Sequence, residues 1–253
     1  QASRAGRRAG VLTCQGDLHE TSGDNDQAST LYDRAVTVAT EANDDEMLAG
    51  ALFARGYLLG VQGEFSAGLA DLRRSQALYE KLGMSQHSVT ALNAIAILYN
   101  RMGDYAQAVH IYTRALRAQR EAGLRREVGV TLYNLGRAHE NLQEWQFAQQ
   151  AYRESLEIQR EIGYARGQAY ALRGLAAVAN AAGDARSALN MLKRAEALQA
   201  HTTDKRLGAH IALMRGIALH RLGRAEESLA SLEAASQVFL ETDALNDLSL
   251  AYA

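Results

Sequence analysis

The sequence predicts an all-α fold, a superhelical solenoid of six antiparallel helix pairs followed by the start of a seventh. One reason is composition: the 253 residues include no proline, and 47% of them are hydrophobic but only 6% aromatic, which favours helices over strands. The other is a turn dipeptide that returns every 40 residues. Its six copies are Gly23-Asp24, Gly63-Glu64, Gly103-Asp104, Gln143-Glu144, Gly183-Asp184 and Gly223-Arg224.

Each copy of this dipeptide is expected to join the first helix of a pair to the second. Glycine supplies the left-handed residue that ends a helix. The aspartates at 24, 104 and 184 are suited to accept a hydrogen bond from a free amide of the next helix. A second glycine, at positions 83, 123 and 163, precedes an apolar residue, a pattern typical of a Schellman-type end to the second helix.

These signals divide the chain into helices in order. We expect the first helices near residues 3–22, 47–62, 86–102, 126–142, 166–182 and 205–222. We expect the second helices near residues 24–42, 64–82, 104–122, 144–162, 184–201 and 224–241. The repeats then span about 9–43, 47–83, 86–123, 126–163, 166–203 and 205–243, with a partial helix at 244–253.

Small and large residues alternate in register on the two helices of each pair. A small residue stands seven positions before each turn, at Gly16, Gly56, Ala96, Gly136, Ala176 and Gly216. A large residue stands nine positions after it, at Tyr32, Leu72, Tyr112, Tyr152, Leu192 and Leu232. Small side chains let helices approach closely, and large ones fill the space between repeats. We therefore expect residues 1–253 to form a single elongated domain, cut from a longer protein.

These columns resemble the tetratricopeptide repeat (TPR) family. The fourth repeat matches its pattern best, with Leu132, Leu135-Gly136, Trp145, Ala148 and Tyr152. The 40-residue period and the absence of proline depart from the common 34-residue repeat. They resemble the longer-helix variety of Pins-type scaffolds and bacterial Rap-type signalling proteins. The resemblance implies a solenoid whose first helices line a concave, peptide-binding surface.

Several function classes find no support in the sequence. With 27 basic and 29 acidic residues the formal net charge is −2, so there is no overall basic field for nucleic acid. Histidines at metal-ligand spacing are absent from the sequence. We therefore expect no metal, no cofactor, no catalytic residue, no nucleic-acid partner and no membrane partner within this fragment. The single cysteine, Cys14, is expected to pack in apolar surroundings.

A polar strip on the first helices is the candidate peptide-binding groove. Helical phase assigns to it Asn93, Asn100, Arg101, Tyr133, Arg137, Arg173 and Asn180, and Asn134 is included as a neighbour of the arginines. Asparagine amides can hold a peptide backbone, and arginines can pair with its carboxylates. The three arginines lie 36 residues apart, so we expect them to follow a diagonal along an acidic, extended ligand. Replacing all three is expected to weaken binding and leave thermal stability nearly unchanged.

The sequence therefore favours a non-catalytic protein- or peptide-binding scaffold, the regulatory module of a larger bacterial signalling protein in the cytoplasm, with a periplasmic location left open. One alternative is a sensory or self-association input domain ahead of a diguanylate cyclase or transcription-regulator output domain. A disfavoured alternative is an enzyme with a helical-solenoid active site. We also expect self-association through the C-terminal end, where Leu245, Leu248 and Leu250 expose apolar surface.

Overall fold

The computed structural model describes residues 4–200, 202 and 204–241, and every regular element within these residues is an α-helix. This confirms the predicted all-α class. The chain divides into two compact units between Gly123 and Leu124. Each unit is described by itself, and the expectation of one continuous domain stays a prediction. None of the described helices is long and apolar enough to cross a membrane.

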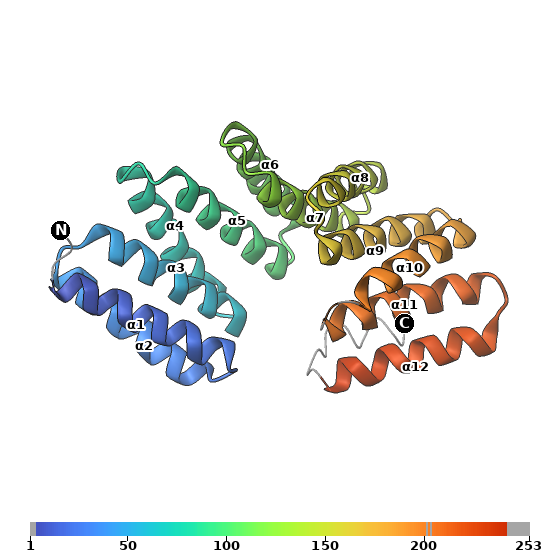
Figure 1. The fold of residues 1–253 in the computed structure, drawn as a ribbon, viewed down its shortest axis with the longest axis horizontal. Coiled ribbons are helices and arrows are strands. Elements are labelled where there is room, and N and C mark those ends of the chain that lie inside the picture. The colour runs from blue at the N-terminus through green and yellow to red at the C-terminus, as the bar shows by residue number, and fades with distance from the viewer. Residues whose placement is uncertain (1–3, 201, 203, 242–253) are drawn as a thin grey trace. The chain divides into compact units, whose positions relative to one another are not determined.

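The described residues form twelve helices, which make the six predicted pairs (Figure 1). The first unit contains α1 (Arg4–Thr21), α2 (Asn25–Glu41), α3 (Asp45–Gln62), α4 (Phe65–Lys81), α5 (Ser85–Met102) and α6 (Tyr105–Glu121). The second contains α7 (Arg125–Asn141), α8 (Trp145–Glu161), α9 (Ala165–Ala181), α10 (Ala185–Gln199), α11 (Lys205–Arg221) and α12 (Ala225–Glu241). All bounds fall within two residues of the expected ones. The expected partial helix at 244–253, with its three leucines, lies outside the described residues.

The helices end where the recurring glycines require a left-handed backbone. Gly23, Gly63, Gly103, Gly183 and Gly223 all have positive φ, and Gln143 adopts the same region with a φ of 59°. The second helices end in the expected way as well. Behind α4, the amide of Gly83 donates to the carbonyl of Glu80 at 3.0 Å and that of Met84 to the carbonyl of Tyr79 at 2.9 Å. This is the Schellman pattern, which satisfies carbonyls at the helix end.

The aspartates after the turns cap the second helices, as predicted. The side chain of Asp24 accepts from the amide of Gln27 at 3.2 Å, and that of Asp104 accepts from Gln107 at 3.1 Å. Asp184 accepts from the amide of Ser187 at 3.1 Å, and hydrogen bonds from the side chain and the amide of Ser187 lower the pKa of Asp184. Each cap satisfies an amide that has no partner inside its helix.

The core is built from the small and large columns of the sequence. Tyr152 of α8 is fully buried. A Cβ added to Gly136 of α7 would come within 2.6 Å of its ring, and one added to Gly174 of α9 would come equally close. The ring therefore lies between two glycines on successive first helices. Tyr32 of α2 packs in the same way against Gly16.

Neighbouring pairs stack through the second helix of one and the first helix of the next. Within the first unit α2 packs on α3 and α4 on α5, and within the second α8 packs on α9 and α10 on α11. First helices also meet each other directly, as α7 and α9 do. This stacking buries the apolar faces that a single pair leaves open.

Cys14 corrects one expectation from the sequence. It lies on α1 and is exposed, whereas we expected it to be buried in apolar surroundings. Its exposed neighbours Val11 and Leu18, which are 57% and 71% accessible, occupy the same face of the helix. The corresponding residues of α3, Ala51 and Leu58, are buried against the preceding pair. The burial expected for this column therefore depends on a preceding pair, and α1 is the first described helix.

Candidate binding site

The strongest candidate site is a cavity of about 300 Å³ between α7 and α9. It lies entirely within the second unit. Residues of α7 and α9 form its walls, the end of α8 contributes one residue, and the turn after α8 adds another. The lining residues are Val130, Tyr133, Asn134, Arg137, Gln159, Tyr164, Arg166, Gly167 and Tyr170.

Tyrosine rings form one wall of this cavity. The ring of Tyr133 lies 5.8 Å from that of Tyr152 and 5.2 Å from that of Tyr170. The hydroxyl of Tyr170 donates to Asp204 Oδ2 at 2.7 Å. Burial, together with this hydrogen bond, raises the pKa of Tyr170 to about 12. The wall is therefore aromatic and neutral, and its ring faces can take an apolar or flat group.

Two arginines near Tyr133 are in different states. Arg173 is buried, donates from Nη2 to the Tyr133 hydroxyl at 3.0 Å and lies 3.6 Å from Glu140 Oε1. Burial alone lowers the pKa of Arg173, but Tyr133 and Glu140 outweigh it, so the pKa is raised. Arg137 is exposed, and the nearby Tyr133 raises its pKa. Both arginines stay charged, and of these two a ligand can reach Arg137. Arg166 is also exposed and lines the cavity, but it is paired with Asp204.

The carboxylates near the cavity are already engaged. Glu140 accepts a hydrogen bond from the Tyr152 hydroxyl and pairs with Arg173. Asp204 accepts from Tyr170 and from Arg166, whose Nε donates at 2.9 Å. Burial raises the pKa of Asp204, but hydrogen bonds from the Leu207 amide, Tyr170 and Arg166 outweigh it, so the pKa is lowered. The accessible charge at the cavity is therefore positive.

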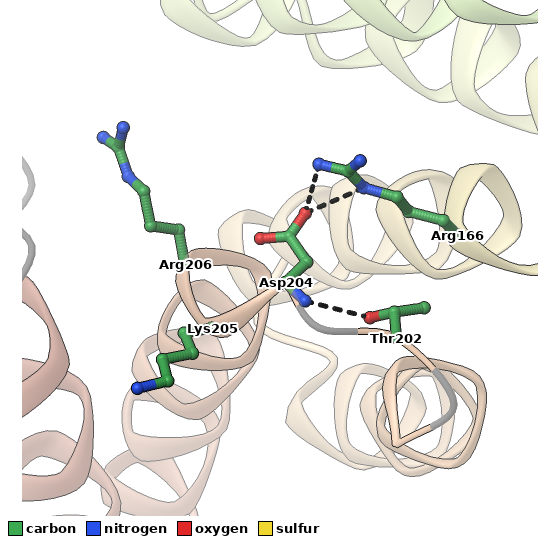
Figure 2. Close-up of a pocket in the computed structure, with 5 residues that line it drawn as sticks. All are labelled: Arg166, Thr202, Asp204, Lys205 and Arg206. Carbon is green, nitrogen blue, oxygen red and sulfur yellow. Dashed lines mark hydrogen bonds and ion pairs between the residues drawn. The ribbon is translucent and has the colours of Figure 1, made fainter. Parts of the chain in front are cut away.

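A second pocket, of about 330 Å³, adjoins Asp204 at the start of α11. In Figure 2 the Arg166 side chain reaches from α9 to the carboxylate of Asp204. Arg206 points away from this carboxylate, and Lys205 lies on the side of Asp204 opposite Arg166. The amide of Asp204 also donates to the hydroxyl of Thr202 at 3.4 Å. Asp204 also caps α11, since its Oδ1 accepts from the Leu207 amide at 3.0 Å, so both oxygens of this carboxylate are already engaged within the protein.

The structure brings together only part of the predicted groove. Tyr133, Asn134 and Arg137 line the cavity. Arg173 lies beside them but is buried against Tyr133. Asn180 is also buried, and its Nδ2 donates to the carbonyl of Met214 at 2.9 Å, so it ties α9 to α11.

The other three predicted residues lie on α5, in the first unit. Asn93 and Asn100 are half-buried, and Arg101 is exposed and donates to the carbonyl of Val61 at 3.1 Å, at the end of α3. The diagonal of three arginines therefore stays a prediction, because Arg101 belongs to one unit and Arg137 and Arg173 to the other.

Six of the nine lining residues are not among the predicted groove residues: Val130, Gln159, Tyr164, Arg166, Gly167 and Tyr170. Gln159 is on a second helix, where the helical phase predicts core, and Tyr164 and Arg166 adjoin a turn. A signal existed: Gly129 and Gly167 break columns that hold Val89 and Glu127 one repeat earlier. Glycines inside helices mark places where another group comes close.

Solved structures of several other proteins have a similar fold. They include a Rap protein complexed with Competence and Sporulation Factor (14% identity, 97% of this chain and 73% of that one, TM-score 0.72), aspartyl phosphate phosphatase F from Bacillus subtilis (11%, 97% and 68%, TM-score 0.78), and the Rap conjugation gene regulator of plasmid pLS20 in complex with the Phr* peptide (15%, 95% and 72%, TM-score 0.71). At these identities the likeness shows the fold.

A search of curated proteins found no match. A family model, Tetratricopeptide repeat, matches residues 47–121 and 127–200. The two matches cover more than half of the chain and coincide with repeats two to five of the structure. Together with the helix pairs that stack within each unit, they show that the chain belongs to the tetratricopeptide repeat family.

Proposed function

We propose that this chain is a non-catalytic peptide-binding module that scaffolds or regulates a larger bacterial signalling protein in the cytoplasm. Its ligand is an extended, acidic peptide that lies across α7 and α9. The observation that carries the proposal is Arg137, an exposed residue whose cation lines the tyrosine-lined cavity.

Charge supports an acidic ligand. Glu140 and Asp204 are bonded within the protein, whereas Arg137 lines the cavity and the nearby Arg173 adds a second positive charge. A wall of low dielectric behind a cation strengthens its attraction for a carboxylate. Asn134 stands one residue after Tyr133 and offers an amide that can bond a peptide backbone.

The fold supports a peptide. Tetratricopeptide arrays are protein-interaction scaffolds, and two proteins of similar fold have been solved in complex with Competence and Sporulation Factor and with the Phr* peptide. A third is named as a phosphatase, which at 11% identity says nothing of this chain's activity. In the proposed module Asn93, Asn100 and Arg101 of α5 give the first unit a peptide-binding surface of its own, and the C-terminal end provides self-association.

The test compares two synthetic nonapeptide libraries that differ only at the central residue, glutamate in one and glutamine in the other. We expect the glutamate library to bind more tightly at low salt, and the difference to shrink as salt screens it. Substitution Arg137→Gln should remove the preference, which for an accessible ion pair is worth about 0.2–1 kcal/mol.

The matched control is Arg153→Gln, which removes the same charge from an exposed position on α8. It should leave the preference intact. Equal binding of the two libraries by the unsubstituted chain would refute the acidic ligand. An equal loss in both variants would mean that overall charge, and not the cavity, attracts the peptide.

A further inference from the structure

Helix α8 contributes one residue to the α7–α9 cavity. The side-chain amide of this residue is buried, and its oxygen accepts no hydrogen bond from the residues that the structure describes. Gln159, at the end of α8, is only 1% exposed and lines the cavity. Its Oε1 has no hydrogen-bond partner among the described residues. Buried side-chain oxygens are nearly always bonded to protein, water or a ligand, because an unmade bond is costly.

Two glycines hold this amide in place. A Cβ added to Gly129 of α7 would come within 2.6 Å of Gln159 Nε2, and one added to Gly167 of α9 would come within 2.6 Å of Oε1. The amide therefore fits between the two first helices only because both positions lack a side chain. Gly167 also lines the cavity, so the unused oxygen packs against a residue of the cavity wall.

The chemistry of the cavity defines what would fill it. An acceptor requires an N–H or O–H donor. The rings of Tyr133, Tyr164 and Tyr170 line the space and favour a flat, apolar body. A cavity of about 300 Å³ is at the small end of the range for ligand sites, so it suits one side chain and not a longer segment.

We propose that the cavity binds a tyrosine side chain of the peptide, whose phenolic O–H donates to Gln159 Oε1. This rests on the proposed peptide-binding function and names the residue that the peptide presents. The acidic residue of the same peptide then pairs with Arg137 at the rim, so the site recognises a tyrosine next to an acid.

The test uses two small probes that differ in the donor. These are p-cresol, which has the phenolic O–H, and 4-methylanisole, in which a methyl ether replaces it. Binding is followed through the amide resonances of Gly129 and Gly167 in isotope-labelled protein. We expect p-cresol to shift both resonances and to bind about tenfold more tightly than 4-methylanisole, as one hydrogen bond to a buried group allows.

Gln159→Met removes the acceptor at nearly constant length and should make the two probes bind equally. Gln119→Met is the matched control, since Gln119 is the equivalent residue of the first unit and its buried Oε1 is also unpartnered among the residues that the structure describes. It should leave the preference for p-cresol unchanged. The comparison of the two probes in the unsubstituted chain decides the question even if Gln159→Met does not fold.

Equal binding of the probes, or no shift at either glycine, would overturn the proposal and assign the unused oxygen to water. The peptide libraries separate this failure from that of the proposed function. If the chain prefers the glutamate library but does not prefer p-cresol, the peptide-binding proposal is retained and the proposal of a bound tyrosine is refuted. A preference for p-cresol without one for glutamate leaves a phenol-binding cavity and refutes the acidic peptide.

Discussion

Two tyrosines that lie three repeats apart have the same place in the fold but different charged neighbours. Tyr32 in the first unit and Tyr152 in the second occupy the same column and are both fully buried. The Tyr32 hydroxyl lies 2.8 Å from both Asp17 Oδ1 and Glu20 Oε2, so the two carboxylates share its one proton. Tyr152 donates to Glu140, and Arg173 from the next pair neutralises that carboxylate.

The difference arises at two columns of the first helices. Where the first unit has Asp17, the second has the cation Arg137, and the residue equivalent to Arg173 is Phe53. The face of α1 is therefore acidic and the face formed by α7 and α9 is basic, although the helices pair in the same way in both units. Backbone geometry and binding chemistry are thus set by different residues of a repeat.

The largest effect should come from the cation that neutralises the second cluster. Arg173→Met leaves Glu140 without its ion pair and the Tyr133 hydroxyl without its donor. We expect a loss of about 3 kcal/mol in the free energy of unfolding, measured by urea denaturation, because one partner of a buried pair is removed.

This result would also correct an expectation from the sequence, that replacing three arginines leaves stability nearly unchanged. Arg137→Met is the control: Arg137 is exposed, and its loss should change stability little. If Arg173→Met and Arg137→Met unfold at the same urea concentration, the buried network does not stabilise the second unit.

Overpacking the tyrosine contact should have the next largest effect. In Gly136→Leu the new side chain meets the Tyr152 ring, because even a Cβ lies 2.6 Å away. We expect destabilisation of about 1–3 kcal/mol, read from the shift in the thermal midpoint. Ala197→Leu adds the same side chain at an exposed site on α10 and should be nearly neutral. If the thermal midpoint of this variant falls as far, the loss in Gly136→Leu does not come from the contact with Tyr152.

Removing each tyrosine hydroxyl compares the two clusters directly. Tyr32→Phe and Tyr152→Phe should each cost about 0.5–1.5 kcal/mol. In Tyr32→Phe the carboxylates of Asp17 and Glu20 lose their shared donor and repel each other, so added salt should restore part of the stability. In Tyr152→Phe the remaining Glu140 pairs with Arg173, so salt should restore nothing. Identical salt responses in unfolding experiments would show that the clusters are electrostatically alike.

The smallest effect should come from the turn. Gln143 holds a φ of 59° where the first unit has Gly103 at 83°. Gln143→Gly removes about 1–2 kcal/mol of left-handed strain but increases the entropy of the unfolded chain. We expect a net gain of about 0.5 kcal/mol in unfolding free energy. Gly103→Gln should give a loss, and a gain in both would exclude backbone strain as the cause.

The sequence predicted the helices well because the residues that end and cap them act locally. A left-handed glycine or a capping aspartate acts within one turn of chain, so a 40-residue repeat of such signals fixes every boundary. The columns of Gly136 and Tyr152 were equally legible, since they alternate in size and recur in register.

The site was predictable only in part because it depends on differences between repeats. Tyr133 and Arg137 follow from helical phase, and Asn134 was predicted as a neighbour of the arginines. The burial of Arg173 does not, since its column also holds Asn93 and Leu213, and only the three-dimensional contact with Glu140 explains it. Gln159 could not be distinguished from core, because its partners are two glycines on other helices.

The pattern of helix contacts bears on how the chain acquires its structure. In both units the packed helices are adjacent in sequence or separated by one helix. Contacts between residues close in sequence lower the contact order, and low contact order is associated with fast folding. The sequence contains no proline, so refolding lacks the slow isomerisation of an X–Pro bond. Recovery of helical signal after dilution from urea should therefore lack a phase of tens of seconds, and folding can begin at any repeat.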